Sequence, residues 1–313
     1  MKAIRVHRFG GPEVMAYEDV ARPLPGSDEV LIRVEAAGVG PWDAWIRAGR
    51  SALPQPLPLT LGSDLAGIVE EVGHGVTEFR SGAEVYGVTN PQFTGAYAQF
   101  AVAKAAMLAP RPSTISFIEA ASLPVIAVTA WQMLFDYAKI QPGQRILILG
   151  ASGNVGSIAV QLAHRHQAYI IAVISAGDAD RLVHLGADQV CDFRDVAAIT
   201  ALPPVDAVID AAGGERQRQG ISMLKPGGYI VSSVSPPDPL LLQERGVNGT
   251  FFLVKTTTRG LRQIADLIDR GALQSRVGAV MPLNEAQLAH QMLDGIKPYV
   301  RGKIILTVDR NET

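Results

Sequence analysis

The centre of the chain carries short apolar runs that alternate with amphipathic segments. The run at 146–149 is short enough for a strand buried on both faces, and further strands are predicted at 169–174, 189–191, 205–209 and 229–233. Apolar residues recur at helical spacing from Val155 to Leu162, and further helices are predicted at 181–185 and 217–224. This alternation is typical of a parallel sheet with helices on both faces, so the pattern predicts an α/β fold with a doubly wound parallel sheet.

The sequence pattern at the two ends of the chain differs from that of the centre. Before about residue 111, short strand-like segments are separated by turns, at 29–34, 66–73 and 82–87. The Pro-rich stretch 53–59 is predicted to be an exposed loop, because proline fixes φ and biases the preceding residue toward extended forms. Later segments predict a strand at 249–254, a helix at 261–270 and a last strand at 302–308. We expect this tail to rejoin the first domain, so that 1–116 and 256–313 form a β-rich domain and 117–255 form the second domain.

Composition narrows the possible partners. The chain has 313 residues, of which 48% are hydrophobic and 19% charged, and its formal net charge is -2 without a run of lysine or arginine. Nucleic acid and anionic membranes are therefore not expected partners. The single cysteine, Cys191, excludes an internal disulfide and a zinc lobe built from several thiolates. The first residues lack the apolar core of a signal peptide, so we expect a cytoplasmic protein.

A glycine-rich turn follows the strand at 146–149 directly. Its residues are Gly150, Ala151, Ser152, Gly153, Asn154, Val155 and Gly156, with Ala151 where the usual G-x-G-x-x-G fingerprint has its first glycine. Gly153 allows the backbone to approach a pyrophosphate, and Gly156 allows the next helix to pack closely against the strand. The free N–H groups and the dipole of that helix favour negative charge at its N-terminus. The turn therefore predicts a dinucleotide site.

The end of the second strand bears on the choice between NAD and NADP. An acid there would bind the ribose 2′-hydroxyl of NAD, but 168–177 contains no Asp or Glu. Ser175 offers a donor, and Arg181 is the nearest cation along the chain, so we expect NADP(H) to be preferred. Asp178 and Asp180 count against this preference.

Several short motifs, taken in their order along the chain, resemble those of a known family. They are 37–43 (AGVGPWD), 61–69 (LGSDLAGIV), 95–98 (GAYA), 120–124 (AASLP), 128–131 (VTAW), the glycine turn, 185–188 (LGAD) and 301–306 (RGKIIL). This order resembles the zinc-free quinone oxidoreductase branch of the medium-chain dehydrogenase/reductase superfamily, over nearly the whole chain. The resemblance implies a GroES-like catalytic domain built from both ends of the chain, a Rossmann domain between them, NADPH bound in a cleft, and a homodimer commonly made through the Rossmann sheets.

The resemblance also implies site residues. Thr129 should touch the nicotinamide end, Trp45 and Asp64 should lie near the site, and Phe252 to Val254 should pass the carboxamide. Trp45 could equally pack in the core, and Asp64 could cap a turn. No catalytic residue is named beyond these candidates, because the proton could come from solvent. Tyr97 is an obvious donor, but its strand-like surroundings favour burial.

The metal ligands of zinc-dependent relatives are missing. Those relatives place a cysteine in the stretch that matches Gly40 and Pro41, and a His-Glu pair in the stretch that matches Ser63 and Asp64. A catalytic zinc is therefore not expected. The isolated histidines His7, His74, His184 and His290 are expected on the surface or in loops.

These features favour an NADPH-dependent, zinc-independent reductase that transfers hydride to a small electrophile, either a quinone or an α,β-unsaturated carbonyl compound. Many relatives have Asn at the position of Gly40 and a phenol at the position of Phe193, and each departure removes one possible hydrogen bond to the cofactor. A non-catalytic NADPH-binding sensor or structural protein therefore stays open as an alternative. An alcohol or aldehyde dehydrogenase of the same fold also stays open, although the missing metal ligands argue against it.

Overall fold

The computed structural model describes residues 1–175, 177–298 and 300–308. The chain divides into two compact units, Met1–Val125 with Thr256–Thr313, and Ile126–Lys255. The first division follows Val125, whereas the sequence suggested a boundary at 116/117. The difference arises because helix α2 (Phe117–Ala121) packs on strands β3 (Glu29–Val39) and β5 (Asp64–Val72) of the first unit.

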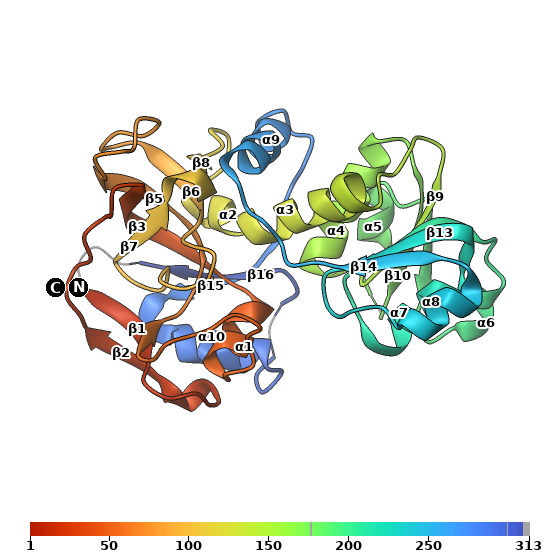
Figure 1. Cartoon of the computed structure of the whole chain (residues 1–313), viewed down its shortest axis with the longest axis horizontal. Helices are drawn as coiled ribbons and strands as arrows, with labels where there is room; N and C mark the ends of the chain where they lie inside the picture. Colours follow the sequence, from red (N-terminus) through yellow and green to blue (C-terminus); the bar gives the residue numbers. More distant parts are fainter. Residues whose placement is uncertain (176, 299, 309–313) are drawn as a thin grey trace. The chain divides into compact units, whose positions relative to one another are not determined.

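The first unit is built mainly from antiparallel strands (Figure 1). A seven-stranded sheet has the order β15-β16-β3-β5-β6-β8, with β7 paired to β3, and a three-stranded sheet has the order β2-β1-β4. The remaining strands are β1 (Lys2–Val6), β2 (Met15–Asp19), β4 (Leu59–Thr60), β6 (Glu84–Val88), β7 (Phe100–Lys104), β8 (Leu108–Pro110), β15 (Val277–Pro282) and β16 (Lys303–Thr307). Strand β16 pairs antiparallel to β3, with Ile305 opposite Gly38. This pairing confirms that the C-terminal strand rejoins the first unit.

The helices of the first unit are short, apart from the one that follows residue 257. They are α1 (Pro41–Arg47), α2, α9 (Thr258–Asp269) and α10 (Ala286–Leu293), with single turns η1 (Pro12–Val14), η2 (Ala105–Met107) and η4 (Leu283–Glu285). Helix α9 confirms the helix expected at 261–270. The sequence pattern did not reveal α1 or α10, because segments of seven or eight residues cover too few turns for a helical period to stand out.

The second unit holds a six-stranded sheet in the order β11-β10-β9-β12-β13-β14, and every neighbouring pair is parallel. The strands are β9 (Arg145–Leu149), β10 (Tyr169–Ile174), β11 (Gln189–Asp192), β12 (Val205–Asp210), β13 (Leu224–Ser232) and β14 (Asn248–Phe251). Numbered along the chain, this order is 3-2-1-4-5-6, the order of a doubly wound dinucleotide-binding sheet. The predicted fold class is confirmed.

Helices connect these strands and lie on both sides of the sheet (Figure 1). They are α3 (Pro124–Trp131), which begins in the first unit, the π-helix η3 (Gln132–Tyr137), α4 (Asn154–Arg165), α5 (Ala179–His184), α6 (Val196–Thr200), α7 (Gly214–Ser222) and α8 (Pro239–Arg245). The central strand β9 is buried because helices cover both of its faces, and Ile146, Leu147 and Ile148 are completely inaccessible. Within the described ranges, no helix is long and apolar enough to span a bilayer.

A buried tyrosine joins the sheet of the first unit to α9. Tyr86 on β6 is fully buried, and its hydroxyl donates a hydrogen bond to the carbonyl oxygen of Leu261 at 2.5 Å. Burial raises the pKa of Tyr86, so the phenol keeps its proton and remains a donor at neutral pH. This bond fixes one end of α9 against β6.

We predict that Tyr86→Phe lowers the free energy of unfolding by about 1–2 kcal/mol, because the bond is lost without loss of packing volume. Urea denaturation followed by circular dichroism measures the change. Tyr229→Phe is the matched control, since the half-buried Tyr229 forms no side-chain hydrogen bond within the described residues. Equal stabilities of the two variants would contradict the prediction.

Candidate active site

The glycine turn leaves the sheet at the carboxyl end of β9. Gly150 has φ of +73°, a conformation that favours glycine, and the amides of Gly150 and Ala151 both donate to the carbonyl oxygen of Val173 at 3.2 and 3.1 Å. The amide of Gly153 then donates to the oxygen of Gly150 at 2.9 Å, which closes the turn. Ala151 is fully buried, so an alanine fits where the usual fingerprint has its first glycine.

Helix α4 begins immediately after this turn, and Gly156 is what allows its close approach. A Cβ at Gly156 would collide with the backbone of Gly150 and Ala151, and the nearest α-carbon would be only 2.7 Å away. Gly153, by contrast, is exposed at the N-cap, so nothing bulky covers the start of the helix. The first N–H groups of an α-helix have no intrahelical partner. The turn therefore offers a positively polarised backbone surface that fits a pyrophosphate.

A second loop beside this turn is organised by Asp210 at the end of β12. Its carboxylate is fully buried and accepts four hydrogen bonds, from the amides of Ala212 and Gly213 and from the side chains of Gln217 and Ser232. Strands β9 and β12 are neighbours, and the strand order reverses between them. In doubly wound sheets this reversal point is where dinucleotides bind. Asp210 therefore fixes the course of the loop that lies beside the glycine turn at this reversal point.

The two residues predicted for the adenosine end follow β10 in the sequence. Ser175 follows β10 directly and is half-buried, and Arg181 is half-buried in the middle of α5. The amide of Phe193, just after β11, donates to the oxygen of Ile174 at 2.8 Å, which brings Phe193 to the same edge of the sheet. The 168–177 range also contains Ala176, which lies outside the described residues.

The residues expected near the nicotinamide are buried or half-buried. Phe252 is buried, and its ring lies 4.4 Å from that of Tyr137, while Val254 is half-buried. Thr129, on α3, is also buried, at 5% exposure. Strand β14 ends at Phe251, so 252–254 leave the sheet as an extended segment, shorter than the strand that was predicted at 249–254.

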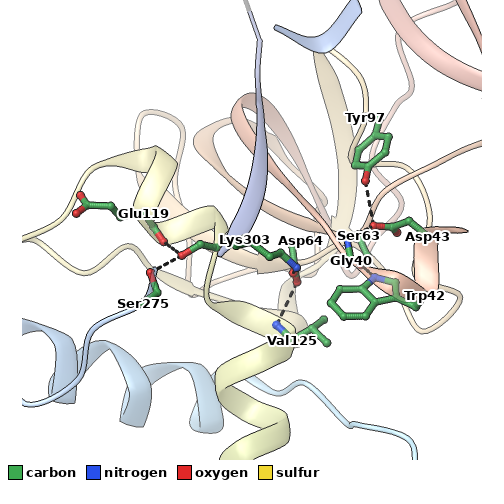
Figure 2. A network of polar contacts seen from close by, with 11 residues as sticks. Gly40, Trp42, Asp43, Ser63, Asp64, Tyr97, Glu119, Val125, Ser275 and Lys303 are labelled. Carbon is green, nitrogen blue, oxygen red and sulfur yellow. Dashed lines mark hydrogen bonds and ion pairs between the residues drawn. The ribbon is translucent and has the colours of Figure 1, made fainter. Parts of the chain in front are cut away.

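A buried ion pair occupies the region of the first unit where zinc-dependent relatives carry metal ligands (Figure 2). Nζ of Lys303 lies 2.8 Å from Oδ2 of Asp64, and the two side chains are 1% and 0% exposed. Oδ1 of Asp64 accepts a hydrogen bond from the amide of Val125, the second residue of α3, at 3.1 Å. Asp64 is thus engaged on both oxygens and positions other groups, and it has no surface through which it could touch a substrate.

The indole of Trp42 covers this ion pair. Nζ of Lys303 lies 4.4 Å from the centre of a Trp42 ring, and Nε1 of Trp42 donates to Oγ of Ser63 at 3.0 Å (Figure 2). A Cβ at Gly40 would collide with the same indole. Trp42 therefore occupies the space of a side chain at position 40. This position of the indole requires glycine at position 40.

A second buried carboxylate, Asp43, lies nearby. Its Oδ2 accepts hydrogen bonds from the amide of Gly40 at 2.8 Å and from the hydroxyl of Tyr97 at 3.0 Å (Figure 2). Burial raises the pKa of Asp43 to about 7, and burial also raises the pKa of Tyr97, so the phenol keeps its proton. Tyr97 is fully buried, which confirms that expectation.

His290 is buried in α10, so the expectation that it lies on the surface or in a loop was wrong. Its Nδ1 lies 2.8 Å from the guanidinium of Arg47, which also forms an ion pair with Asp294 at 2.6 Å. Burial and the charge of Arg47 lower the pKa of His290 to about 3, so the ring is neutral and its Nδ1 accepts the bond. Tertiary packing between α1 and α10, which the sequence did not reveal, buries this imidazole.

Trp45 lies on α1 and is 42% exposed, so it is not a core residue. In the part of the chain that the structure describes, no three His, Cys, Asp or Glu side chains are grouped so that they could hold a metal ion. A separate groove in the first unit is lined by Asp28, Glu78, Arg259 and Arg262, among others, and none of the predicted site residues lines it.

Comparison with known proteins identifies the family. A family model described as an alcohol dehydrogenase GroES-like domain matches residues 26–113, and one described as a zinc-binding dehydrogenase matches residues 185–306. The quinone oxidoreductase of Mus musculus is 33% identical over 312 residues and 93% of each chain. The chain belongs to the quinone oxidoreductase branch of the medium-chain dehydrogenase/reductase superfamily.

Solved structures of this oxidoreductase family agree with that assignment. The quinone oxidoreductase from Coxiella burnetii has a TM-score of 0.91 and 31% identity, and the comparison covers 99% of both chains. The Escherichia coli quinone oxidoreductase complexed with NADPH has a TM-score of 0.88 and 28% identity, over 98% of this chain and 100% of that chain. The GroES-like and Rossmann parts expected from the sequence are both confirmed.

Sequence reasoning missed the charged residues that organise both parts of this family member. Lys303 opens an apolar strand, GKIIL, and Asp210 ends another and precedes two small residues and two glycines. A charge at the end of a buried strand is a usable signal, because burial of an unpaired charge is costly and implies a partner. The sequence did not identify that partner, since Asp64 and Lys303 are far apart along the chain.

We predict that Lys303→Met lowers the free energy of unfolding by about 3–5 kcal/mol at about pH 8, because it leaves the Asp64 carboxylate buried without its cation. Burial already raises the pKa of Asp64 against the opposing effect of Lys303, so the folded state binds this proton more tightly than the unfolded state. Stability therefore falls as the pH rises through the folded pKa, and removing Lys303 extends this fall to higher pH. The loss should be smaller at about pH 6.

The double variant Lys303→Met/Asp64→Asn is the control, because Asn keeps an acceptor for the Val125 amide without a charge. Urea denaturation at both pH values should show that the double variant recovers more than half of the lost stability. Equal losses in the two variants, with no dependence on pH, would show that lost packing and not the buried charge dominates.

Proposed function

We propose that this protein is an NADPH-dependent, zinc-independent oxidoreductase that transfers hydride to a quinone or an α,β-unsaturated carbonyl compound. The observation that carries the proposal is the glycine cradle at the switch point of a 3-2-1-4-5-6 sheet, in a chain of the quinone oxidoreductase family. A Cβ at Gly156 would collide with the turn's backbone, so only this glycine permits the close helix packing that a pyrophosphate site requires.

Several residues of the second unit would hold the dinucleotide. The turn from Gly150 to Gly156 would bind the pyrophosphate through its backbone, and Asp210 would keep the neighbouring loop in place. Ser175 and Arg181 would lie toward the adenosine ribose, and Phe252 and Val254 toward the nicotinamide. The lack of an acid at the end of β10 supports NADP over NAD, because a carboxylate there would repel a 2′-phosphate.

When bound, the nicotinamide would supply the hydride. The chain's own contribution would be to fix the positions of the reactants and to exclude water. The stretches that hold metal ligands in zinc-dependent relatives match Gly40 and Pro41, and Ser63 and Asp64, in this chain, and Lys303 forms an ion pair with Asp64. An acceptor that is already electrophilic needs no metal, which supports a quinone or an enone as substrate. Exposed Trp45 offers a flat apolar surface for such a compound.

A second candidate function is that of an NADPH-binding protein without catalysis, acting as a sensor or structural component. Two observations favour it: Gly40 and Phe193 each lack a polar side chain that many relatives have. We also propose that the protein is a cytoplasmic homodimer. The strand β14 supports the dimer, because it is the last strand of its sheet and has one unpaired edge within the described chain.

The decisive experiment follows NADPH and NADH absorbance against a benzoquinone, a naphthoquinone, an enone and an aldehyde, and follows an alcohol in the reverse direction, with and without chelator. We expect turnover of a quinone or the enone that resists chelator and prefers NADPH. Turnover of the aldehyde or alcohol that chelator abolishes would establish the dehydrogenase alternative. Tight NADPH binding without oxidation by any acceptor would establish the non-catalytic alternative.

We predict that Gly156→Val abolishes NADPH binding, because the branched side chain would separate α4 from the turn. Isothermal titration calorimetry measures the affinity, and circular dichroism shows whether the fold is retained. Ile158→Val on the same helix is the matched control, since it removes one methylene from a buried side chain and leaves the turn unchanged. NADPH affinity that is unchanged in Gly156→Val would refute this location of the pyrophosphate.

A further inference from the structure

A cation lies over an aromatic ring at the carboxyl edge of the Rossmann sheet. The guanidinium carbon of Arg216, on α7, lies 3.9 Å from the centre of the Phe193 ring. Both residues are half-buried, so the stack is partly accessible to solvent. Contact with an aromatic face stabilises a guanidinium without neutralising its charge. Arg216 is therefore positioned as well as charged.

The stack lies close to the end of β10. The amide of Phe193 donates to the oxygen of Ile174 at 2.8 Å, and Asp192 pairs with Ile174 in the parallel ladder between β10 and β11. In doubly wound sheets of this order, the adenosine half of a dinucleotide lies outside the carboxyl end of the second strand, which is β10 here. Arg216 thus reaches from α7 to the edge of the sheet where a 2′-phosphate would lie.

The charge of Arg216 is left available, in contrast to the arginines around it. Arg194 forms an ion pair with Asp192, with its Nε 3.0 Å from Oδ1, and Arg218 lies 3.7 Å from Asp238. Arg216 forms no ion pair with any residue that the structure describes. The charge of Arg216 contributes to the lowered pKa of Asp192, but the main cause is Arg194. Arg194 already donates hydrogen bonds to both carboxylate oxygens of Asp192. Arg216 can therefore take another anion.

We propose that Arg216, held in place by the ring of Phe193, binds the 2′-phosphate of NADPH and sets the preference of this protein for NADPH over NADH. The proposal rests on the proposed function, since it concerns the same dinucleotide. A guanidinium can form two parallel hydrogen bonds to a phosphate, which NADH, with its 2′-hydroxyl, cannot use. Phe193 contributes no hydroxyl of its own, and its role is to orient the guanidinium.

Arg181 is the competing residue, because the sequence places it closest to the end of β10 along the chain. It is half-buried in α5 and engaged in contacts of its own. Arg216, in contrast, contacts the ring of Phe193 and forms no ion pair with any residue that the structure describes. Substitution of each arginine separately therefore distinguishes the two assignments.

The test uses calorimetry with four probes, which are 2′,5′-ADP, 5′-AMP, NADPH and NADH. We expect Arg216→Ala to weaken binding of 2′,5′-ADP and NADPH by about 10- to 100-fold, the range of a lost charge-assisted hydrogen bond, and to change 5′-AMP and NADH by less than about 3-fold. Phe193→Leu should produce a smaller loss in the same direction. Arg218→Ala on the same helix is the matched control and should match the unaltered protein with all four probes.

Each other outcome has a distinct meaning. Equal weakening of 2′,5′-ADP and 5′-AMP would show that Arg216 stacks on adenine, which overturns the phosphate assignment. If Arg181→Ala selectively loses affinity for 2′,5′-ADP and NADPH while Arg216→Ala keeps it, Arg181 and not Arg216 binds the 2′-phosphate. If the unaltered protein binds NADH as tightly as NADPH, this inference and the proposed preference for NADPH both fail, while the proposed transfer of hydride from a nicotinamide cofactor stands. If it binds none of the four probes, the proposed function itself fails.

Discussion

The pairing of Lys303 with Asp64 links parts of the chain that lie far apart in the sequence. Lys303 belongs to the last strand, Asp64 begins β5, and Val125, whose amide Asp64 accepts, lies in the first turn of α3. A buried charge requires a partner, so the contacts of Asp64 hold β16 and the start of α3 close to the start of β5. Gly38 has no side chain at this point, and a Cβ there would come within 2.9 Å of Cε of Lys303. The C-terminal strand, the first sheet and the start of α3 therefore depend on one ionic contact.

The second unit uses the same principle with a different partner. Asp210 is buried as fully as Asp64, but backbone amides, an amide side chain and a hydroxyl satisfy its carboxylate, and no cation takes part. Hydrogen bonds of this kind hold the backbone of the loop after β12 in a fixed course beside the glycine turn. An ion pair fixes whole elements to one another, whereas a carboxylate that binds amides fixes the path of a single loop. A dinucleotide crevice needs the second kind of order, because its walls are made of backbone.

Periodicity and turn residues in the sequence predicted those elements whose structure depends on neighbouring residues. The buried strands β9, β10 and β12, the glycine turn and the amphipathic α9 follow from apolar periodicity and from the conformational freedom of glycine, and the structure confirms them. The burial of His290 did not follow from the sequence, because it depends on Arg47, more than two hundred residues away, and on packing between two helices that were not predicted. The role of Asp64 was foreseen only as a possibility, since a carboxylate that caps a turn and one near a reaction have the same local sequence. The long-range partner, Lys303, is not visible in that local sequence.

The two departures from the family pattern share a physical explanation. At Gly40 the indole of Trp42 fills the space of a side chain and covers the ammonium of Lys303. At position 193 the ring has no hydroxyl, and its face lies against the guanidinium of Arg216. In each case an aromatic ring at or beside the departure lies against a cation. A ring holds a cation without neutralising it, whereas a carboxylate partner removes the net charge. Lys303 is buried and has both a carboxylate partner, Asp64, and an aromatic partner, Trp42, so its charge is neutralised within the fold. Among the described residues Arg216 has only the ring as a partner and is half-buried, so its charge remains available to an anion.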